Sequence, residues 1–403
     1  MVRGPDKNQM RVLISGSSGL VGTAVSQLLA ENRYTVSRLL RRQSAANIVE
    51  ASPVEKRVER HAEDEIQNEV RSEAHDEVEN EIENEVQTEI QAEPLTDIPD
   101  EVLGESEGEL QSEAQSEGQN EVQEEVQNVA ENEIPIQPPV PNDVRWDPVA
   151  NEFDAAAAEG ADAVVHLAGA SIGGGRWTTV RKALLRSSRV DATRHLVDSL
   201  SALNAKPKIF VGVSAVGYYG DRGDEKLTDH SGPGSDFLAQ ICKDWERESS
   251  RAAEFGARVA ILRFGIILST RGGALPRMLT PIKMFVGGKL GSGQQWMSWI
   301  SLDDAASVIR FVLENESARG PINTVSPYPI RNADFTKKAA RAVHRPAIFP
   351  APAFALRLML GEMADGLLLS SQRALPEKLK TLGYQFQDSD LGFTLARLIS
   401  ERK

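Results

Sequence analysis

The chain has 403 residues, enough to bury at least one large hydrophobic core. Its net charge of −14 is unevenly spread, because residues 50–134 hold 29 Asp and Glu against 4 Lys and Arg and leave the remainder at +11. The single cysteine, Cys242, excludes an intrachain disulfide framework and a thiolate metal cluster, and no stretch is apolar for long enough to span a membrane.

The first predicted element is a strand over residues 10–15, followed by a glycine-rich turn and then a helical pattern. The turn reads Gly16-Ser17-Ser18-Gly19-Leu20-Val21-Gly22. Such a turn alone is common, but between a strand and a helix it predicts a dinucleotide site. Gly16 permits a tight turn, Gly19 lets the backbone approach a pyrophosphate, and Gly22 lets the helix pack closely on the strand. We therefore expect the phosphates at the unpaired N–H groups of the helix N-terminus.

The second predicted strand, 34–40, ends at Leu40 and runs into Arg41 and Arg42, with no acid before Glu50. An NAD site places Asp or Glu here to bind the ribose 2′-hydroxyl, whereas an NADP site uses Arg for the 2′-phosphate. A guanidinium suits a phosphate and is a poor match for a hydroxyl. The sequence thus favours NADP(H), and the alternative is a solvated basic pair on a loop.

Residues 50–141 form an acidic, low-complexity insertion that is too long for an ordinary α/β connection. Val78, Ile82, Val86 and Ile90 recur every four residues, a spacing that drifts around a helix and makes no lasting apolar face. High negative charge and few bulky apolar residues predict disorder or a frayed, solvated helix. The insertion is either a tolerated surface expansion or an acidic arm that contacts the basic body.

After the insertion the sheet resumes. Strands are predicted at 143–148, 161–169, 208–214 and 258–264, and helices at 178–203 and 237–255. This alternation predicts an α/β, Rossmann-like, doubly wound parallel sheet with ligands at the carboxyl ends of its strands. We assign 10–49 and 142–270 to an NADP-binding Rossmann domain. His166, inside a strand, is expected to be a packed side chain, whereas the small Ala168 and Gly169 let a cofactor lie against the strand end.

Residues 271–403 are predicted to form a smaller C-terminal region that closes over the nicotinamide and supplies the substrate pocket. Helical patterns cover 333–343 and 353–363. Trp296, Met297 and Trp299 would either contact the substrate or pack between the two domains.

Taken together, the chain resembles the short-chain dehydrogenase/reductase superfamily of the extended, epimerase-like kind. More narrowly it is similar to the atypical, sugar-nucleotide epimerase-like (NAD-dependent epimerase/dehydratase-like) branch with its own C-terminal domain. The motifs that carry the resemblance are Gly16–Gly22, His166–Gly169, Arg176–Thr178, Ser188-Arg189, Ser214–Gly220, Trp245-Glu246, Gly291–Ile300, Pro350–Leu356, Gly361–Ala364 and Leu375-Pro376. The cofactor contacts that the resemblance implies are Gly16–Gly22, Leu40, Arg41, Leu167, Ala168 and Leu184.

The superfamily's usual catalyst is a Tyr-x-x-x-Lys pair on a helix, in which the lysine stabilises the phenolate. Here the matching helix, 236–246, contains no tyrosine, and Lys243 has Ala239 four residues before it. Ser214, Tyr218 and Tyr219 remain as catalytic candidates, since they lie where ligands of such sheets bind. In the alternative, the serine caps the strand end and the tyrosines line the pocket wall.

Two arginines, Arg189 and Arg263, could hold an anionic or carbonyl group, although a surface or ion-paired arginine is the commoner situation. The functional hypothesis is an NADP(H)-dependent oxidoreductase or epimerase-like enzyme acting on a small carbonyl or sugar-nucleotide substrate. The alternative is a catalytically silent NADP(H)-binding sensor or regulatory protein. The composition indicates no nucleic acid, membrane or metal as partner and a cytoplasmic location, and it leaves the oligomeric state open.

Overall fold

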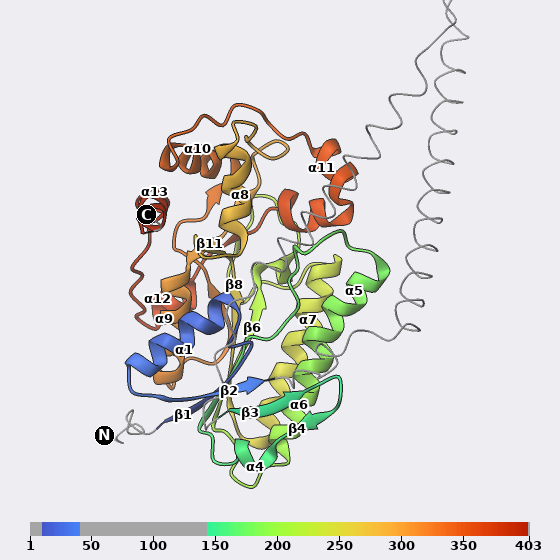
Figure 1. Cartoon of the computed structure of the whole chain (residues 1–403), viewed down its shortest axis with the longest axis vertical. Helices are drawn as coiled ribbons and strands as arrows, with labels where there is room; N and C mark the ends of the chain where they lie inside the picture. Colours follow the sequence, from blue (N-terminus) through green and yellow to red (C-terminus); the bar gives the residue numbers. More distant parts are fainter. Residues whose placement is uncertain (1–9, 41–142, 402–403) are drawn as a thin grey trace, which may run out of the picture. The chain divides into compact units, whose positions relative to one another are not determined.

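The computed structural model describes residues 10–40 and 143–401, so the predicted insertion and Arg41 and Arg42 lie outside the described residues. In the described part of the chain, eight strands form one sheet in the order β12-β8-β6-β5-β1-β2-β3-β4 (Figure 1). These strands are β1 (Arg11–Ser15), β2 (Thr35–Leu40), β3 (Val144–Asp147), β4 (Glu152–Phe153), β5 (Ala163–His166), β6 (Ile209–Ala215), β8 (Arg258–Phe264) and β12 (Gly320–Thr324). All of the pairings are parallel except the antiparallel β3–β4 pair.

Strand β1 lies at the point where the strand order reverses. It pairs with β2 on one side, with Val12 opposite Val36, and with β5 on the other, with Val12 opposite Ala163. The chain therefore builds the sheet outward in one direction through β3 and in the other through β6 and β8. A crevice for ligands forms at such a switch point, outside the carboxyl ends of the strands. The predicted doubly wound Rossmann-like sheet and the return strand at 143–148 are confirmed.

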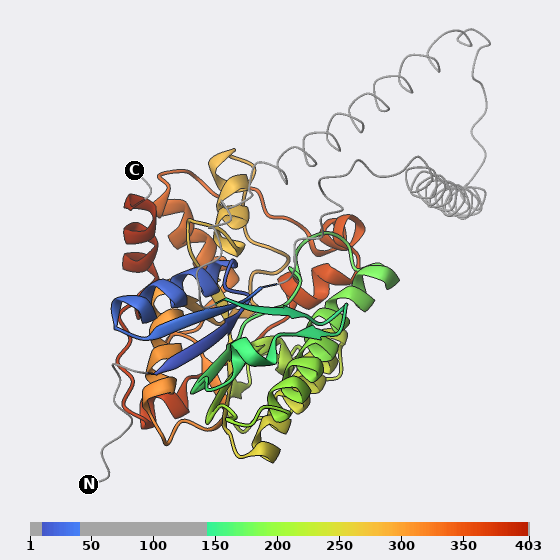
Figure 2. The same ribbon diagram turned by 60° about the horizontal axis from the view of Figure 1, so that its bottom comes forward.

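Helices cover both faces of the sheet, which explains why its strands are continuous apolar runs (Figure 2). On one face, α1 (Leu20–Glu31) and α9 (Leu302–Glu314) share a core that includes Val25 and Ile309. On the other, α6 (Ala192–Ser201) packs Leu196 against Phe210 of β6.

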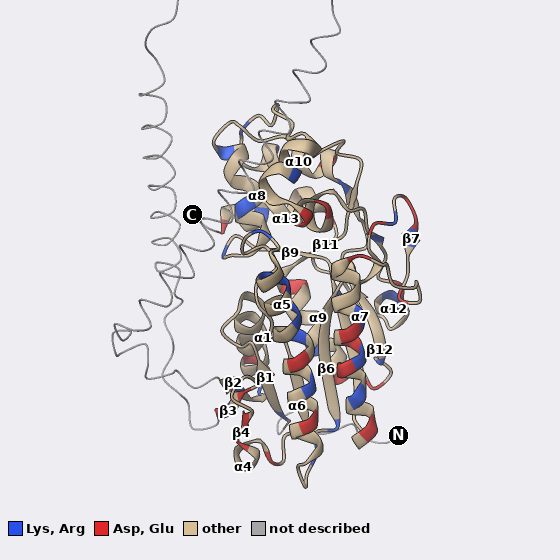
Figure 3. Cartoon of the chain, turned by 90° about the vertical axis from the view of Figure 1, so that its right-hand side faces the viewer, with Lys and Arg blue, Asp and Glu red and all other residues tan. Residues whose placement is uncertain are grey.

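The second face is built from two helical segments. One comprises α5 (Thr179–Arg186), a π-helical turn (Ser187–Asp191) and α6; the other is α7 (Phe237–Ser250) with a 3-10 turn (Arg251–Phe255). Acidic and basic residues alternate along α6 and α7 (Figure 3). Arg194 bonds Glu248 at 3.2 Å, and Arg251 bonds Asp198 at 2.6 Å. These pairs join the outer sides of the two segments.

The region after residue 270 contributes both to the sheet and to a separate core. Strand β12 extends the sheet beside β8, and α9 lies on α1, so elements beyond the predicted boundary at 270 complete the Rossmann-like layer. Trp299, Phe335 and Leu395 belong to a second core. The division into domains at 270 stays a prediction. The remaining elements are α4 (Ala155–Ala158), a 3-10 turn (Val216–Tyr219), β7 (Lys226–Leu227), β9 (Ile266–Leu268), α8 (Ala274–Lys283), β10 (Trp296–Met297), β11 (Trp299–Ser301), β13 (Ile330–Arg331), α10 (Asn332–Ala342), α11 (Ala353–Leu360), a π-helical segment (Ala364–Leu369), β14 (Arg373–Ala374), α12 (Glu377–Thr381) and α13 (Leu391–Ser400).

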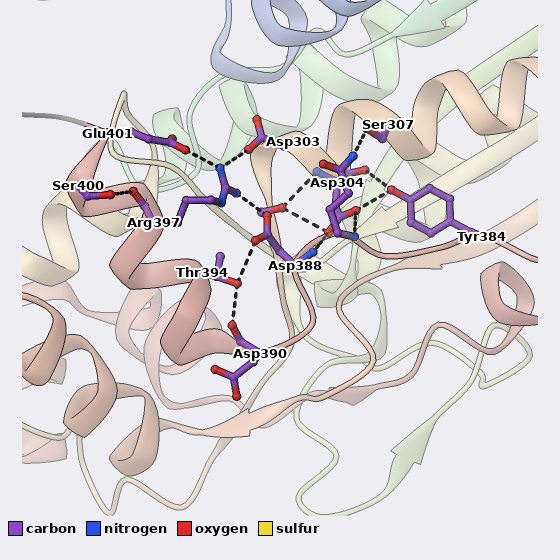
Figure 4. A network of polar contacts seen from close by, with 12 residues as sticks. Asp303, Asp304, Ser307, Tyr384, Asp388, Asp390, Thr394, Arg397, Ser400 and Glu401 are labelled. Carbon is purple, nitrogen blue, oxygen red and sulfur yellow. Dashed lines mark hydrogen bonds and ion pairs between the residues drawn. The ribbon is translucent and has the colours of Figure 1, made fainter.

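A polar network ties the C-terminal helix α13 to α9 (Figure 4). The buried Asp304 of α9 accepts a hydrogen bond from the Tyr384 hydroxyl at 2.8 Å and from the Asp388 backbone N–H at 2.9 Å. Arg397 of α13 bonds Asp388 at 2.5 Å and Asp303 at 2.9 Å. The last helix is thereby held against the helix that packs on α1.

None of the helices within 10–40 and 143–401 is long and apolar enough to cross a membrane. The cytoplasmic location stays a prediction.

Candidate functional site

The glycine turn between β1 and α1 is shaped so that two of its glycines cannot carry a side chain. Gly16 has φ +69°, and a Cβ there would lie 2.9 Å from the backbone N of Ala168. A Cβ on Gly22 would lie 2.1 Å from the carbonyl oxygen of Gly16. Gly19 differs, since its Cβ would meet only the Gly16 oxygen, at 3.3 Å. The turn is therefore close-packed at Gly16 and Gly22, and Gly19 keeps its outer side clear for a ligand.

The N-terminus of α1 is open to an anion. Its N-cap residue is Gly19, which supplies no capping side chain, and the first turn carries no acid. Orphan N–H groups and the helix dipole then favour a phosphate group. Ser18 and Gly19 are exposed, Leu20 and Val21 are half-buried, and Ser17 is buried. The residues present thus fit the diphosphate of a dinucleotide.

A buried chain of hydrogen bonds fixes the neighbouring end of β5. The Ser15 hydroxyl accepts the Leu167 and Ala168 backbone N–H groups at 3.1 and 3.3 Å and lies 2.6 Å from Nδ1 of His166. Nε2 of His166 lies 2.8 Å from the Thr193 hydroxyl. Burial lowers the pKa of His166 to about 3, so its ring is neutral. His166 is a packed structural side chain, and it holds Leu167 and Ala168 in place beside Gly16.

Tyr219 takes part in a second buried network, at the ends of β6 and β8. Its hydroxyl bonds Oδ1 of Asn323 at 2.6 Å and accepts an N–H of Arg263 at 2.9 Å. Arg263 in turn bonds both carboxylate oxygens of Glu246 at 2.8 Å. Burial raises the pKa of Tyr219 to about 12. With its hydroxyl occupied by protein groups, Tyr219 is better suited to positioning its neighbours than to proton transfer.

Ser214 and Tyr218, by contrast, have uncommitted hydroxyl groups. Ser214 is 4% exposed, and its hydroxyl has no hydrogen-bond partner among the described residues. The adjoining Cys242 thiol is a weak partner, because burial raises its pKa to about 11 and keeps it neutral. Tyr218 is half-buried and lies flat under the guanidinium of Arg263, 3.5 Å from its ring centroid. Neither hydroxyl has a strong hydrogen-bond partner among the described residues.

The other predicted site residues fall in different places. Leu40 is half-buried at the end of β2, Leu184 is exposed on α5, and Lys243 is exposed on α7, as a solvated helix face requires. Arg41 and Arg42, the basis for the NADP(H) prediction, lie outside the described residues. None of the predicted cofactor or catalytic assignments is tested by these positions alone.

The structure favours a packing role over substrate contact for Trp296, Met297 and Trp299. Trp299 is fully buried and donates its indole N–H to the Tyr328 carbonyl at 3.0 Å, and Met297 lies in the same core. Trp296 is held between Arg331 and Arg373, 4.7 and 4.3 Å from its ring, and bonds Asp224 at 2.7 Å.

The structure contains a cavity of about 270 Å³ whose lining residues the sequence analysis did not identify. Its lining comes from two distant segments. Trp177, Asp221, Asp236, Phe237 and Leu238 belong to the Rossmann-like part, and Arg357, Glu362, Asp365, Gly366, Leu369 and Ser370 to the C-terminal region. That the C-terminal region supplies the substrate pocket stays a prediction. No local sequence signal identifies the individual residues, because the lining exists only once the two segments meet.

Comparison with known proteins agrees with this architecture. Residues 145–325 match the NAD dependent epimerase/dehydratase family, and residues 351–398 match a domain of unknown function, DUF1731. Epimerase family protein ML0860 of Mycobacterium leprae is 40% identical over 254 residues, covering 63% of this chain and 82% of that protein.

Solved structures show the same fold. The human epimerase family protein SDR39U1 (isoform 2), solved with NADPH, has a TM-score of 0.68 at 23% identity and covers 97% of this chain and 99% of its own. The UDP-glucuronic acid 4-epimerase of Bacillus cereus, solved with UDP-glucuronic acid and NAD, has a TM-score of 0.59 at 15% identity, covering 98% of this chain and all of its own (100%). A nicotinamide cofactor is thus common to these neighbours, whereas its phosphorylation state differs between them.

Proposed function

Because the chain belongs to the NAD-dependent epimerase/dehydratase family, we propose that it is an NADP(H)-dependent oxidoreductase or epimerase-like enzyme that acts on a small carbonyl substrate. The observation that carries the proposal is the glycine turn at the switch point, where Gly16 and Gly22 admit no side chain and the N-terminus of α1 is uncapped. Such a turn binds a diphosphate through backbone N–H groups.

The choice of NADP(H) over NAD(H) rests on the two arginines after β2. Arg41 and Arg42 follow Leu40 directly, with no acid nearby to bind a free ribose hydroxyl. The NADPH in the human neighbour is in line with this choice.

The bound nicotinamide would supply or accept a hydride, and the protein's own groups would handle the carbonyl oxygen. Ser214 would donate its unpartnered hydroxyl to that oxygen and polarise the carbonyl. Tyr218 would deliver or remove the proton, and the Arg263 guanidinium stacked on its ring would hold the phenol in position. Tyr219 would hold Arg263 in place.

The cavity of about 270 Å³ does not include Ser214 or Tyr218 in its lining, so its size does not select between a small carbonyl compound and a sugar nucleotide. Sugar-nucleotide epimerisation stays the broader possibility within the same family.

The test is NADPH consumption, followed by absorbance, with a panel of aldehydes and ketones. Replacing Ser214 by Ala or Tyr218 by Phe should lower kcat by about 10²- to 10⁴-fold, because each removes a group that acts on the carbonyl oxygen. Tyr328→Phe is the matched control, since Tyr328 is 67% exposed. NADPH binding without turnover of any carbonyl would contradict the enzymatic proposal.

The second candidate, a catalytically silent NADP(H) sensor, is favoured by one observation. Helix α7 carries no Tyr-x-x-x-Lys pair, and Lys243 is exposed to solvent. A Ser214→Ala, Tyr218→Phe double variant decides between the two. Loss of a measurable turnover with unchanged NADPH affinity would exclude the sensor.

A further inference from the structure

Arg189 is a buried charge with no counter-ion among the residues that the structure describes. The residue is 8% exposed, and its guanidinium donates to the carbonyls of Ala170 at 2.9 Å and Leu185 at 3.3 Å. No carboxylate of residues 10–40 or 143–401 lies within 4.0 Å of it. Two carbonyls occupy only part of its five N–H donors.

Arg263 shows how the same fold treats a buried arginine whose charge is balanced within the protein. Arg263 is 3% exposed, and Glu246 neutralises it with two hydrogen bonds of 2.8 Å. A buried charge without such a partner is costly unless a ligand completes it. The contrast indicates that the counter-ion of Arg189 comes from outside the described residues.

A further buried donor, unpaired within the described part of the chain, lies close to Arg189. The guanidinium carbon lies 5.3 Å from the ring of Trp245, whose indole N–H is unpaired among the described residues. The two side chains therefore offer a guanidinium and an indole N–H, and neither is a carboxylate.

The backbone connects this group to the cofactor turn. Arg189 lies in the π-helical turn Ser187–Asp191, and π-helical turns occur frequently at functional sites. The Thr193 hydroxyl bonds the Arg189 carbonyl at 2.5 Å and lies 2.8 Å from His166, which contacts Ser15 at the end of β1. A Cβ on Gly169 would lie 3.2 Å from the guanidinium carbon. Arg189 is thus fixed at the carboxyl end of β5.

We propose that Arg189, assisted by Trp245, binds a carboxylate of the substrate, so that the enzyme acts on carbonyl compounds that carry a carboxylate. This assignment rests on the proposed function. A planar guanidinium matches a carboxylate with two parallel hydrogen bonds, and the surrounding donors reject groups that cannot accept.

The experiment compares 2-oxo acids of increasing chain length with the corresponding 2-oxo amides, as substrates with NADPH and as titrants of the NADP⁺-saturated full chain in calorimetry. The amide keeps the carbonyl and the shape but lacks the charge. We expect the wild type to prefer the acid, and Arg189→Met to lose about 10- to 100-fold in affinity and kcat/KM for the acid with little change for the amide.

Two variants serve as references. Arg189→Lys keeps the charge but not the paired geometry, so it should retain part of the preference and shows that the fold survives a change at this position. Arg186→Met removes an exposed arginine from the same helical segment, where it is ion-paired with Asp244 at 2.6 Å, and should leave the preference unchanged.

The outcomes separate this proposal from the function it rests on. Turnover of carbonyls without preference for the acid, or a preference that survives in Arg189→Met, would overturn the carboxylate site while leaving the enzyme intact. Absence of any difference between acid and amide in calorimetry would overturn it as well. Weaker binding of NADPH itself to Arg189→Met would assign the guanidinium to a cofactor phosphate and contradict the substrate assignment.

Discussion

Buried charges at the carboxyl edge of the sheet differ in what neutralises them. Arg263 depends on Glu246, whose two oxygens both bond its guanidinium. Glu246→Gln would leave that guanidinium buried without a counter-ion, so we expect a loss of about 3–5 kcal/mol in the free energy of unfolding. Urea unfolding measures this loss. Glu254→Gln, the same change at an exposed position just after the helix, is the control, and equal effects of the two variants would refute a special role for the pair.

His166 makes the stability of the fold depend on pH. Burial lowers the pKa of His166 from 6.5 to about 3, so the unfolded chain binds a proton over this range and the folded protein does not. The contribution of neutral His166 to the free energy of unfolding is complete above the pKa that His166 has in the unfolded chain. As the pH falls below that pKa, the contribution decreases by about 1.4 kcal/mol per pH unit. Urea unfolding of the wild type and of His166→Asn at about pH 6 and about pH 4.5 isolates the contribution of His166. The carboxylates titrate in both proteins, so their effect cancels when the two pH dependences are compared. Identical pH slopes would show that His166 contributes nothing.

The sequence distinguished poorly between residues whose roles depend on distant partners. Tyr218 and Tyr219 are adjacent and equivalent as candidates, yet Asn323 and Arg263 occupy the hydroxyl of Tyr219 only. Arg189 and Arg263 could likewise not be separated, because Glu246 reaches only one of them. Burial of each side chain follows from contacts between segments that are far apart in the chain, and no local pattern records those contacts.

At the scale of elements, the shape of the β1–α1 turn depends on the close packing of Gly22 against Gly16. A Cβ on Gly22 would lie 2.1 Å from the Gly16 oxygen, so Gly22→Ala must push α1 away from the turn. We expect NADPH affinity to fall by at least about 100-fold, which corresponds to roughly 3 kcal/mol.

Isothermal titration calorimetry checks this expectation, with Gly232→Ala as the matched control because a Cβ there meets nothing within 4 Å. Undiminished NADPH binding by a folded Gly22→Ala protein would place the cofactor elsewhere.

Elements with strong local periodicity were predictable, and those defined by tertiary pairing were not. The strands β1, β2, β6 and β8 and the helices α1 and α7 follow from apolar runs and helical spacing. Helix α9 and strand β12 were not identified, since β12 is defined by its pairing with β8 and most of α9 is buried. A short apolar run gives no period that would separate strand from helix.

At the scale of the whole molecule, the C-terminal helix α13 is attached to α9 by the network around Asp304 (Figure 4). Asp304→Ala removes the acceptor for Tyr384, Gln387 and Asp388, so α13 should open more readily than the sheet. We expect the opening free energy of α13 amides to fall by at least about 2 kcal/mol. Hydrogen exchange measures this, with Ser400→Ala as control because its hydroxyl bonds only the Arg397 carbonyl. Unchanged protection of α13 would show that other contacts hold it.

The continuity of the sheet across the acidic segment was predictable, whereas the cavity was not. Leu39 pairs with Val144 and Leu40 with Arg145, so the strands on either side of that segment are neighbours, as the return to apolar alternation at 143–148 indicates. The cavity forms only where Trp177 and Phe237 come close to Arg357 and Asp365, which lie in a different part of the chain. Secondary-structure patterns do not predict such tertiary contacts.

The central claim is that the uncapped N-terminus of α1 binds the diphosphate of a nicotinamide dinucleotide, and that Arg41 and Arg42 select the 2′-phosphate. Calorimetric titration of the full chain with NADPH and with NADH tests it most directly. We predict saturable binding of NADPH, with NADH weaker by at least about 10-fold because it offers the arginines no phosphate. Equal affinities would contradict the selection of NADP(H), and no binding of either coenzyme would contradict the site itself.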